Sequence, residues 1–224
     1  MRIDVFFDTT CPWCFIGKRR LEKALRTRPL VTADIHWRPF LLNPDIPIGG
    51  LPRRKYLEDK FGSTHRVERV FGAIAKAGAK DGLNFDFNAL TTTPNTLHSH
   101  RMIRYAATMG LAQEAVEAIF QAYFVEFRNI GSIEELVRIG ESLGLETACL
   151  QGHLNSQVDV TPVFGENATA QRIGITGVPC FVFDEQSAIA GAQDTDIFLR
   201  LIDLSLEIGS QDSLVSQSQQ TALR

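Results

Sequence analysis

The segment that decides the fold spans residues 2–25 and reads RIDVFFDTTCPWCFIGKRRLEKAL. Its first six residues are apolar and β-prone and end at Asp8 and two threonines, which predicts a buried strand entering a turn. The residues from Lys18 onward favour a helix, and Pro12 suits a first helical turn, where its missing N–H costs nothing. Cys11 and Cys14 therefore lie where a strand gives way to a helix.

This position gives the cysteine pair a specific chemistry. Two residues three apart on a helix face the same way, so the sulfurs of Cys11 and Cys14 can bond. The free N–H groups and positive end of the helix favour a thiolate at Cys11, and the thiolate is the attacking species in disulfide exchange. The sequence thus predicts a redox pair in which Cys11 attacks and Cys14 resolves.

Half of a zinc site is the main alternative for this pair. A zinc site would need a second close pair of ligands, but Cys149 and Cys180 are isolated and His98 stands two residues from His100. These spacings match no usual zinc motif, so we expect no metal. Inert structural cysteines are the other alternative.

The rest of the chain divides into three parts. Residues 31–38 alternate apolar and polar, which predicts a half-buried strand that completes a β-α-β unit with parallel strands. Apolar residues at helical spacing then dominate residues 45–154, and the aromatic stripe from Phe120 to Phe127 is interpreted as core. Residues 180–190 predict a hairpin before a last helix, and the Ser- and Gln-rich residues 209–224 predict a disordered tail.

We therefore expect an α/β fold in which two distant pieces share one mixed sheet. Residues 1–44 and 155–208 form the sheet domain, and residues 45–154 form a large all-helical insertion. Pro179 is predicted to open the late strand, because proline cannot donate to a sheet ladder. On this pattern alone it is an ordinary edge proline.

Several motifs, in order, resemble those of the DsbA-like family and, more narrowly, its FrnE-like branch. They cover most of residues 2–205 and comprise residues 8–18, residues 37–44, Pro94-Asn95-Thr96 with His100-Arg101, Gly177-Val178-Pro179, and Gly191-Ala192-Gln193. The resemblance implies a thioredoxin-like fold with a helical insertion. It also implies that the Val178–Pro179 loop lies against Cys11, with a cis peptide bond.

The function that follows is that of a thiol–disulfide oxidoreductase. Cys11 and Cys14 are the expected catalytic residues, and the Val178 backbone is expected to pair with the substrate like an added strand. The further expected substrate contacts are Pro12, Trp13, Pro179, Gln193, Asp194, Asn95 and His100. For Asn95 and His100 a local structural role, such as a helix cap, is the alternative.

Two rival functions stay open. The first is a glutathione-dependent isomerase or transferase, because the 2-hydroxychromene-2-carboxylate isomerases and kappa-class glutathione transferases are similar in architecture. Those proteins typically have serine in the region of the first cysteine and use glutathione. In this chain, Gln193 and Asp194 would then contact the glutathione. The second rival is a non-enzymatic holdase or partner-binding protein. Cys180 departs from the FrnE-like pattern, so it is either a buried structural thiol, as we expect, or a relay to Cys14.

Composition and charge narrow the partners. With 23 basic and 26 acidic residues and a net charge of −3, no basic patch for nucleic acid is expected. Acids interrupt the N-terminus where a signal peptide would be apolar, and no membrane-spanning stretch is found, so we expect a cytoplasmic protein. Its expected partners are protein or small-molecule thiols and disulfides. We expect no required cofactor, with glutathione as a candidate thiol co-substrate. The sequence is compatible with either direction of electron flow between the protein and its substrate.

Overall fold

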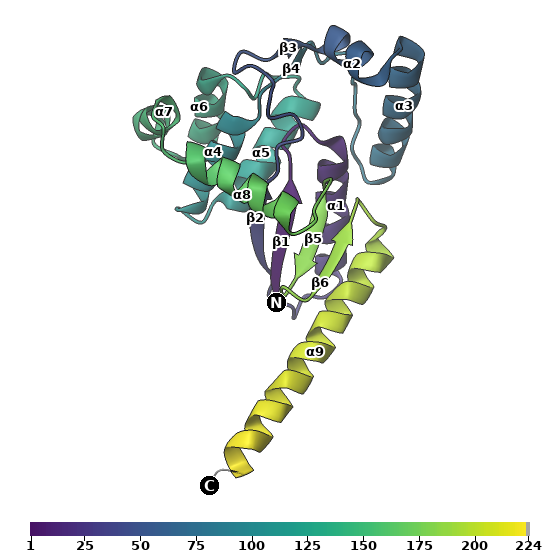
Figure 1. Ribbon diagram of the computed structural model, residues 1–224, viewed down its shortest axis with the longest axis vertical. Helices are drawn as coiled ribbons and strands as arrows, with labels where there is room; N and C mark the ends of the chain where they lie inside the picture. The colour runs from purple at the N-terminus through teal and green to yellow at the C-terminus, as the bar shows by residue number, and fades with distance from the viewer. Residues whose placement is uncertain (223–224) are drawn as a thin grey trace.

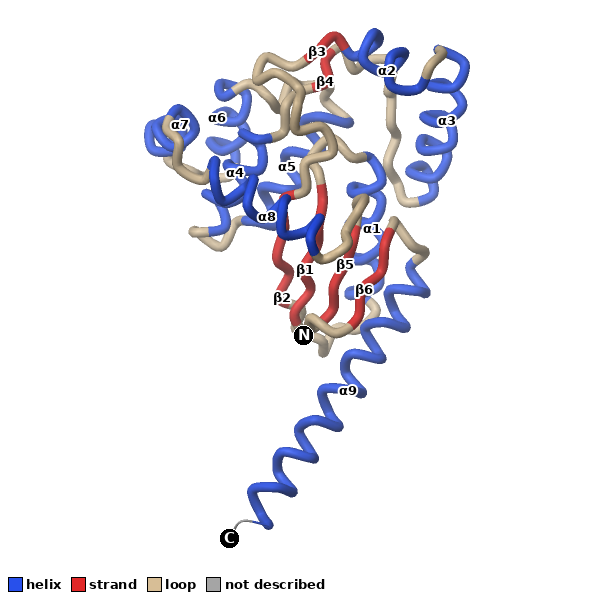
Figure 2. The backbone as a smooth tube through the Cα atoms, in the orientation of Figure 1, coloured by secondary structure: helices blue, strands red, loops and turns tan. Residues whose placement is uncertain are grey.

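The computed structural model describes the backbone of residues 1–222 and the side chains of residues 1–208. Within them, the first and last parts of the chain share one mixed sheet in the order β2-β1-β5-β6 (Figures 1 and 2). The strands are β1 (Arg2–Phe7), β2 (Asp34–Pro39), β5 (Cys180–Phe183) and β6 (Ser187–Ala190). Strand β1 is parallel to β2 and antiparallel to β5, so the predicted β-α-β unit and late hairpin are both present.

Helices cover both faces of this sheet. Helices α1 (Pro12–Arg26) and α9 (Thr195–Ala222) pack against each other on one face, where α5 (Ala112–Phe124) also contacts β2. Helix α8 (Val160–Arg172) lies on the opposite face, and its Ala170 packs in a small cluster with Phe6 and Cys180. Because β1 alternates its side chains between these faces, Phe6 and Phe7 belong to different clusters.

The region between β2 and α8 is mainly helical. Its helices are α2 (Arg53–Phe61), α3 (Thr64–Lys80), α4 (Leu97–Ala107), α5, α6 (Ile133–Ser142) and α7 (Thr147–Asn155). The expectation of an all-helical insertion needs one correction, because β3 (Leu51–Pro52) and β4 (Thr92–Thr93) form a short antiparallel pair. Two-residue strands leave no alternation to detect, and their pairing joins residues far apart in the sequence.

Helix α9 continues to Ala222, where composition predicts a disordered tail from Gly209; residues 223 and 224 lie outside the described residues. No proline follows Gly209, and a single glycine costs a helix only about 1 kcal/mol, so the sequence permits this continuation. No helix in the described part of the chain combines the length and apolar character needed to cross a bilayer.

An aromatic core supports the start of α1. The Phe15 ring stacks on Phe120 with centroids 4.9 Å apart, and Phe7 meets Phe120 edge-on. Phe120 and Phe124 are fully buried, as the stripe predicts. Phe127 is different, since it lies beyond the end of α5 and is 38% exposed.

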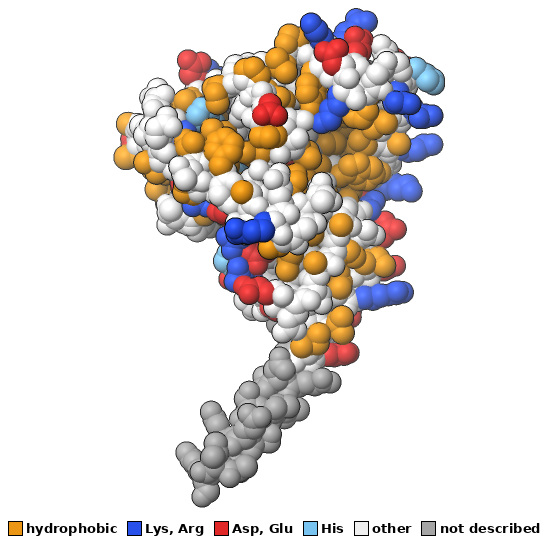
Figure 3. All heavy atoms as spheres, in the orientation of Figure 1, with side chains coloured by type: hydrophobic (Ala, Val, Ile, Leu, Met, Phe, Trp, Pro, Cys, Tyr) orange, Lys and Arg blue, Asp and Glu red, His pale blue; other side chains and the backbone are white. Residues whose placement is uncertain are grey.

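Helices α2 and α3 form an arm beside α1. Ile74 on α3 is buried in the main core, and Phe71 packs against that core from the same helix. In the space-filling view, basic side chains follow the outer edge of the arm and apolar side chains gather between the arm and the body (Figure 3). The arm thus places an apolar surface next to the first turn of α1.

Candidate active site

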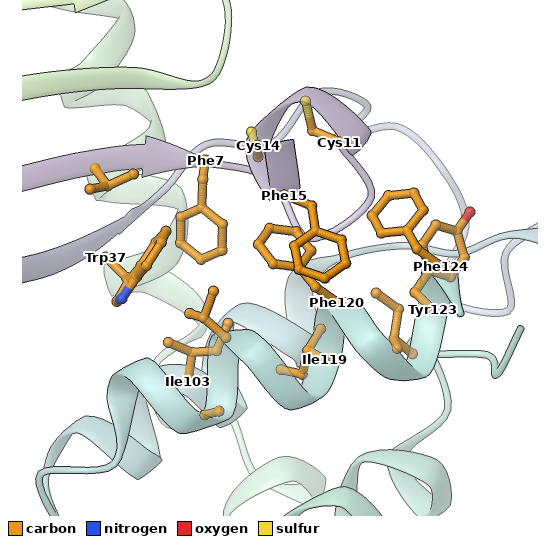
Figure 4. Close-up of a cluster of buried hydrophobic side chains, with 14 of the residues drawn as sticks. Phe7, Cys11, Cys14, Phe15, Trp37, Ile103, Ile119, Phe120, Tyr123 and Phe124 are labelled. Atoms are coloured by element: carbon orange, nitrogen blue, oxygen red, sulfur yellow. The ribbon is translucent and has the colours of Figure 1, made fainter. Parts of the chain in front are cut away.

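Cys11 is the residue that precedes the first turn of α1. Its backbone is extended, with φ −89° and ψ 110°, and Pro12 follows at the first helical position. The Cys14 N–H donates to the Cys11 carbonyl oxygen at 3.0 Å, which closes the first turn. Both thiols are free and buried, and they lie above the aromatic core (Figure 4). The predicted strand-to-helix position of the pair is confirmed.

The surroundings of Cys14 keep its sulfur protonated. Burial raises the pKa of Cys14 well above its ordinary value, and a hydrogen bond to Cys11 raises it further. A protonated thiol is a poor nucleophile. This environment suits Cys14 to a second, resolving step rather than to the first attack.

The proline loop faces Cys11. The Val178–Pro179 peptide bond is cis, and the Cys11 thiol donates to the Val178 carbonyl oxygen at 3.6 Å. The backbone of Val178 therefore lies within reach of a group bonded to the Cys11 sulfur. Both sequence expectations for this loop, its bond geometry and its place against Cys11, agree with the structure.

Gly17 sets how closely α1 approaches this loop. A Cβ atom added at Gly17 would lie 2.9 Å from Phe181 Cζ and 3.2 Å from Pro179 Cγ. The first distance is shorter than real Cβ contacts and the second is tighter than most, so a larger residue would require the Phe181 ring, and to a smaller extent the Pro179 ring, to shift. The sequence reasoning did not assign this role, since it depends on contacts between distant segments.

Asp8 belongs to the motif of residues 8–18, but the sequence reasoning gave it no role of its own. It is 1% exposed, and its carboxylate accepts from the Thr10 N–H and hydroxyl at 2.9 Å and from the Leu42 N–H at 2.7 Å. Burial raises the pKa of Asp8, and these hydrogen bonds offset part of the increase. Asp8 thus fixes the loop before Cys11. An acid directly after a buried strand was the available signal.

A groove of about 290 Å³ opens beside Cys11. It contains four of the predicted site residues, namely Cys11, Pro12, Trp13 and Val178. Helix α2 adds Arg53, Tyr56 and Lys60, and α3 adds the apolar residues Val70, Phe71 and Ile74. The arm residues were missed, because no sequence pattern shows that α2 and α3 fold back over the cysteines.

The other predicted contact residues do not line this groove. The Gln193 side chain donates to the Ala190 carbonyl oxygen at 2.8 Å, and Asp194 pairs with Arg20 at 3.0 Å at the start of α9. Asp194 nevertheless keeps 84% of its side chain exposed. These two residues stay candidates for ligand contact at a neighbouring edge.

Asn95 and His100 have structural partners. Asn95 accepts from the Leu97 N–H at 2.9 Å and donates to the Ile46 carbonyl oxygen, so it has a local structural role one residue before Thr96, the N-cap of α4. The His100 ring lies edge-on to Phe7, and burial lowers its pKa to about 3. His100 is thus a neutral core histidine at ordinary pH.

The remaining cysteines lie apart from the pair. Cys180 is buried on the opposite sheet face, where burial raises its pKa, as expected for a structural thiol. Cys149 is exposed on α7, and its N–H donates to Glu146 at the start of that helix. Among the residues the structure describes, no three His, Cys, Asp or Glu side chains are grouped to hold a metal.

The fold and its cysteine pair define a thioredoxin-fold protein with a dithiol at the start of its first helix. The chain belongs to the family of the DSBA-like thioredoxin domain, whose model matches residues 2–203. This agrees with the resemblance drawn from the motifs.

Several known proteins are similar to this chain in sequence or in structure. The Bacillus subtilis protein YwbO is 27% identical over 209 residues, covering 90% of this chain and 96% of its own. A probable DsbA oxidoreductase from Streptomyces coelicolor has 25% identity and a TM-score of 0.83, covering 92% of this chain and 90% of its own. A 2-hydroxychromene-2-carboxylate isomerase has the same fold at 17% identity and a TM-score of 0.69, covering 96% and 99%.

Proposed function

We propose that this protein is a thiol–disulfide oxidoreductase that works through a Cys11–Cys14 dithiol and disulfide. The observation that carries the proposal is the position of Cys11, a free cysteine at the N-terminus of α1 whose sulfur meets the Val178 carbonyl. Family membership and the likeness to DsbA oxidoreductases support the same chemistry.

The reaction has two balanced steps. The Cys11 thiolate attacks one sulfur of a substrate disulfide, forms a mixed disulfide and expels the other half as a thiolate, which takes up a proton. Cys14 then loses its proton and attacks the Cys11 sulfur, releasing the second half as a thiol. Two electrons pass from the enzyme dithiol to the substrate, and the reverse sequence oxidises a substrate dithiol.

The proposal includes a cytoplasmic location and glutathione as a thiol co-substrate. Its support is a cytosolic disulfide reductase from Pseudomonas aeruginosa, solved with glutathione, that shares the fold at 19% identity and a TM-score of 0.60, covering 94% of this chain and 98% of its own. Protein or small-molecule disulfides are the proposed partners. Residues 1–44 and 155–208 are proposed as the thioredoxin-like domain and residues 45–154 as the inserted one.

A glutathione-dependent isomerase or transferase is the second candidate. The fold of the hydroxychromene carboxylate isomerase favours it, as does the Asp194 carboxylate, which pairs with Arg20 but is exposed enough to meet a ligand ammonium group as well. Against it stands the second cysteine, since a dithiol is not needed for isomerisation. A holdase, the third candidate, would keep its activity when both cysteines are replaced.

Insulin reduction with dithiothreitol as electron donor tests the proposal. Cys11→Ser is expected to abolish the reaction, and Cys14→Ser is expected to accumulate mixed disulfides that mass spectrometry detects. Cys149→Ser removes an exposed thiol away from the groove and is the matched control, with unchanged activity expected. Full activity of the Cys11→Ser protein would refute the mechanism.

A further inference from the structure

The groove beside Cys11 carries positive charge that no carboxylate of the described residues neutralises, although Lys60 donates to Asn43 at 2.7 Å and to the Tyr56 hydroxyl at 3.0 Å. Arg53 lines the groove and is 7% exposed, and Lys60 lies along the same wall. Among the described residues, no carboxylate lies within ion-pair distance of either side chain, and none of the groove-lining residues is Asp or Glu. The groove is therefore apolar with two cations.

The contacts of Arg53 leave part of its guanidinium unused. One nitrogen donates to the Tyr123 hydroxyl at 3.1 Å, and the group lies over the Phe71 ring at 5.1 Å. Its Nε is buried and has no hydrogen-bond partner. A buried donor of a charged group that stays unpaired is costly, so such a group is expected to meet an acceptor supplied from outside.

Thr93 provides a second unpaired group on the same wall. It is 3% exposed, its hydroxyl has no partner, and it lines the groove with Arg53. The β3–β4 pair explains the juxtaposition, since Leu51 pairs with Thr93 and the Arg53 N–H donates to the Thr91 carbonyl oxygen. The short strands that interrupt the helical insertion thus bring Arg53 and Thr93 to the same groove.

We propose that Arg53 and Thr93 form a carboxylate-binding subsite, which holds a low-molecular-weight disulfide while one of its sulfurs meets Cys11. The guanidinium fork and a hydroxyl match the acceptors of a carboxylate. The volume of about 290 Å³ lies near the lower end of the range for small-molecule sites. Buried Cys11 favours the same class, because a small molecule reaches its sulfur more easily.

This inference rests on the proposed function and names the substrate class of the same site. The reaction is the two-step thiol–disulfide exchange of the proposed function: two electrons pass from the dithiol to the disulfide, which leaves as two thiols. Reduced protein can carry out one such turnover without an added reductant. The rate constant of that single turnover is therefore the quantity to measure.

Two disulfides that share the arm –S–CH2–CH2– and differ in the group at its end form the probe pair. Dithiodipropionate carries a carboxylate on each arm, and hydroxyethyl disulfide carries a neutral hydroxyl there. Stopped flow measures the rate constant for oxidation of the reduced protein by each disulfide. Each rate constant is divided by the rate constant for the reaction of the same disulfide with dithiothreitol, which corrects for the intrinsic reactivity of the disulfide. We expect a normalised preference for dithiodipropionate of about tenfold or more, the range for a charged hydrogen bond.

Arg53→Gln is expected to lower this preference about tenfold, by slowing the reaction with dithiodipropionate more than the reaction with hydroxyethyl disulfide. Arg54→Gln is the matched control, because Arg54 is exposed, pairs with Glu58 and lies outside the groove. It removes the same charge from the same helix and should keep the preference. Thr93→Val, which keeps the shape of the side chain, should lower it by a smaller factor without unfolding the protein.

The rate with hydroxyethyl disulfide separates the possible failures. Loss of both rates in Arg53→Gln would report misfolding of that variant. Thr93→Val is then the test, and an unchanged preference for dithiodipropionate in Thr93→Val would overturn the subsite. Equal normalised rates in the unmodified protein, or the same preference in Arg53→Gln, overturn the subsite and leave the oxidoreductase intact. If neither disulfide oxidises the protein through Cys11, the proposed function fails and this inference with it.

Discussion

Replacing Gly17 by alanine tests how the two halves of the site are held together. The added Cβ would lie 2.9 Å from Phe181 Cζ and 3.2 Å from Pro179 Cγ. Phe181 is fully buried and meets the Phe198 ring at 4.7 Å, so it cannot move away without disturbing its neighbours. Overpacking of this kind costs typically about 1–3 kcal/mol.

Helix propensity acts in the opposite direction and has to be subtracted. Alanine is better than glycine inside a helix by about 1 kcal/mol. Gly152 on α7 is the matched control, since a Cβ there meets nothing within 4 Å. We therefore expect Gly17→Ala to have a free energy of unfolding lower than that of Gly152→Ala by about 1–3 kcal/mol.

Urea unfolding measures this difference, and the single-turnover rate with hydroxyethyl disulfide measures its effect on the site. Gly17→Ala should also slow that reaction, because the added Cβ crowds the ring of Pro179, which belongs to the loop that faces Cys11. Gly152→Ala should react at the unmodified rate. Equal stabilities and equal rates for the two variants would refute the role assigned to Gly17.

Two further predictions concern buried groups. Burial holds the pKa of His100 at about 3 in the folded protein, against 6.5 ordinarily, so the unfolded chain binds the proton first. The free energy of unfolding should therefore fall by about 1.4 kcal/mol per pH unit below pH 6.5, down to about pH 3, and urea unfolding of His100→Gln should show a flatter profile. An identical profile would rule out His100 as the source. Cys180→Ala should keep its full rate of insulin reduction, because Cys180 lies on the sheet face opposite the pair, and disulfide mapping after partial oxidation should find no bond to it. Appreciable yield of a Cys180 disulfide, or loss of turnover in a stable variant, would favour the relay.

Local patterns were enough to predict the sheet and the dithiol. The strand before Cys11, the proline after it and the late hairpin each depend on neighbouring residues, and all are present. The alternation over residues 31–38 predicted a strand that begins three residues too early, since β2 begins at Asp34. Residues 31–33 do alternate, but they lie before the first residue that pairs with β1.

The groove could not be predicted in the same way. Arg53 and Thr93 are brought together by the pairing of two-residue strands, and Gly17 matters through contacts with Phe181 and Pro179. Each of these relationships joins segments distant in sequence. Asn95 and His100, chosen from motifs, have local or core partners instead of lining the groove.

The reduction potential of the Cys11–Cys14 pair, measured against glutathione, shows whether these two cysteines interconvert between a dithiol and a disulfide. Protein equilibrated in buffers of defined glutathione ratio is quenched with acid, alkylated and mapped by mass spectrometry. We expect a reversible two-electron transition in which Cys11 and Cys14 lose their alkylation together and form one disulfide, while Cys180 stays a thiol. Cys11 found only as a mixed disulfide with glutathione, or both cysteines alkylated at every ratio, would contradict it.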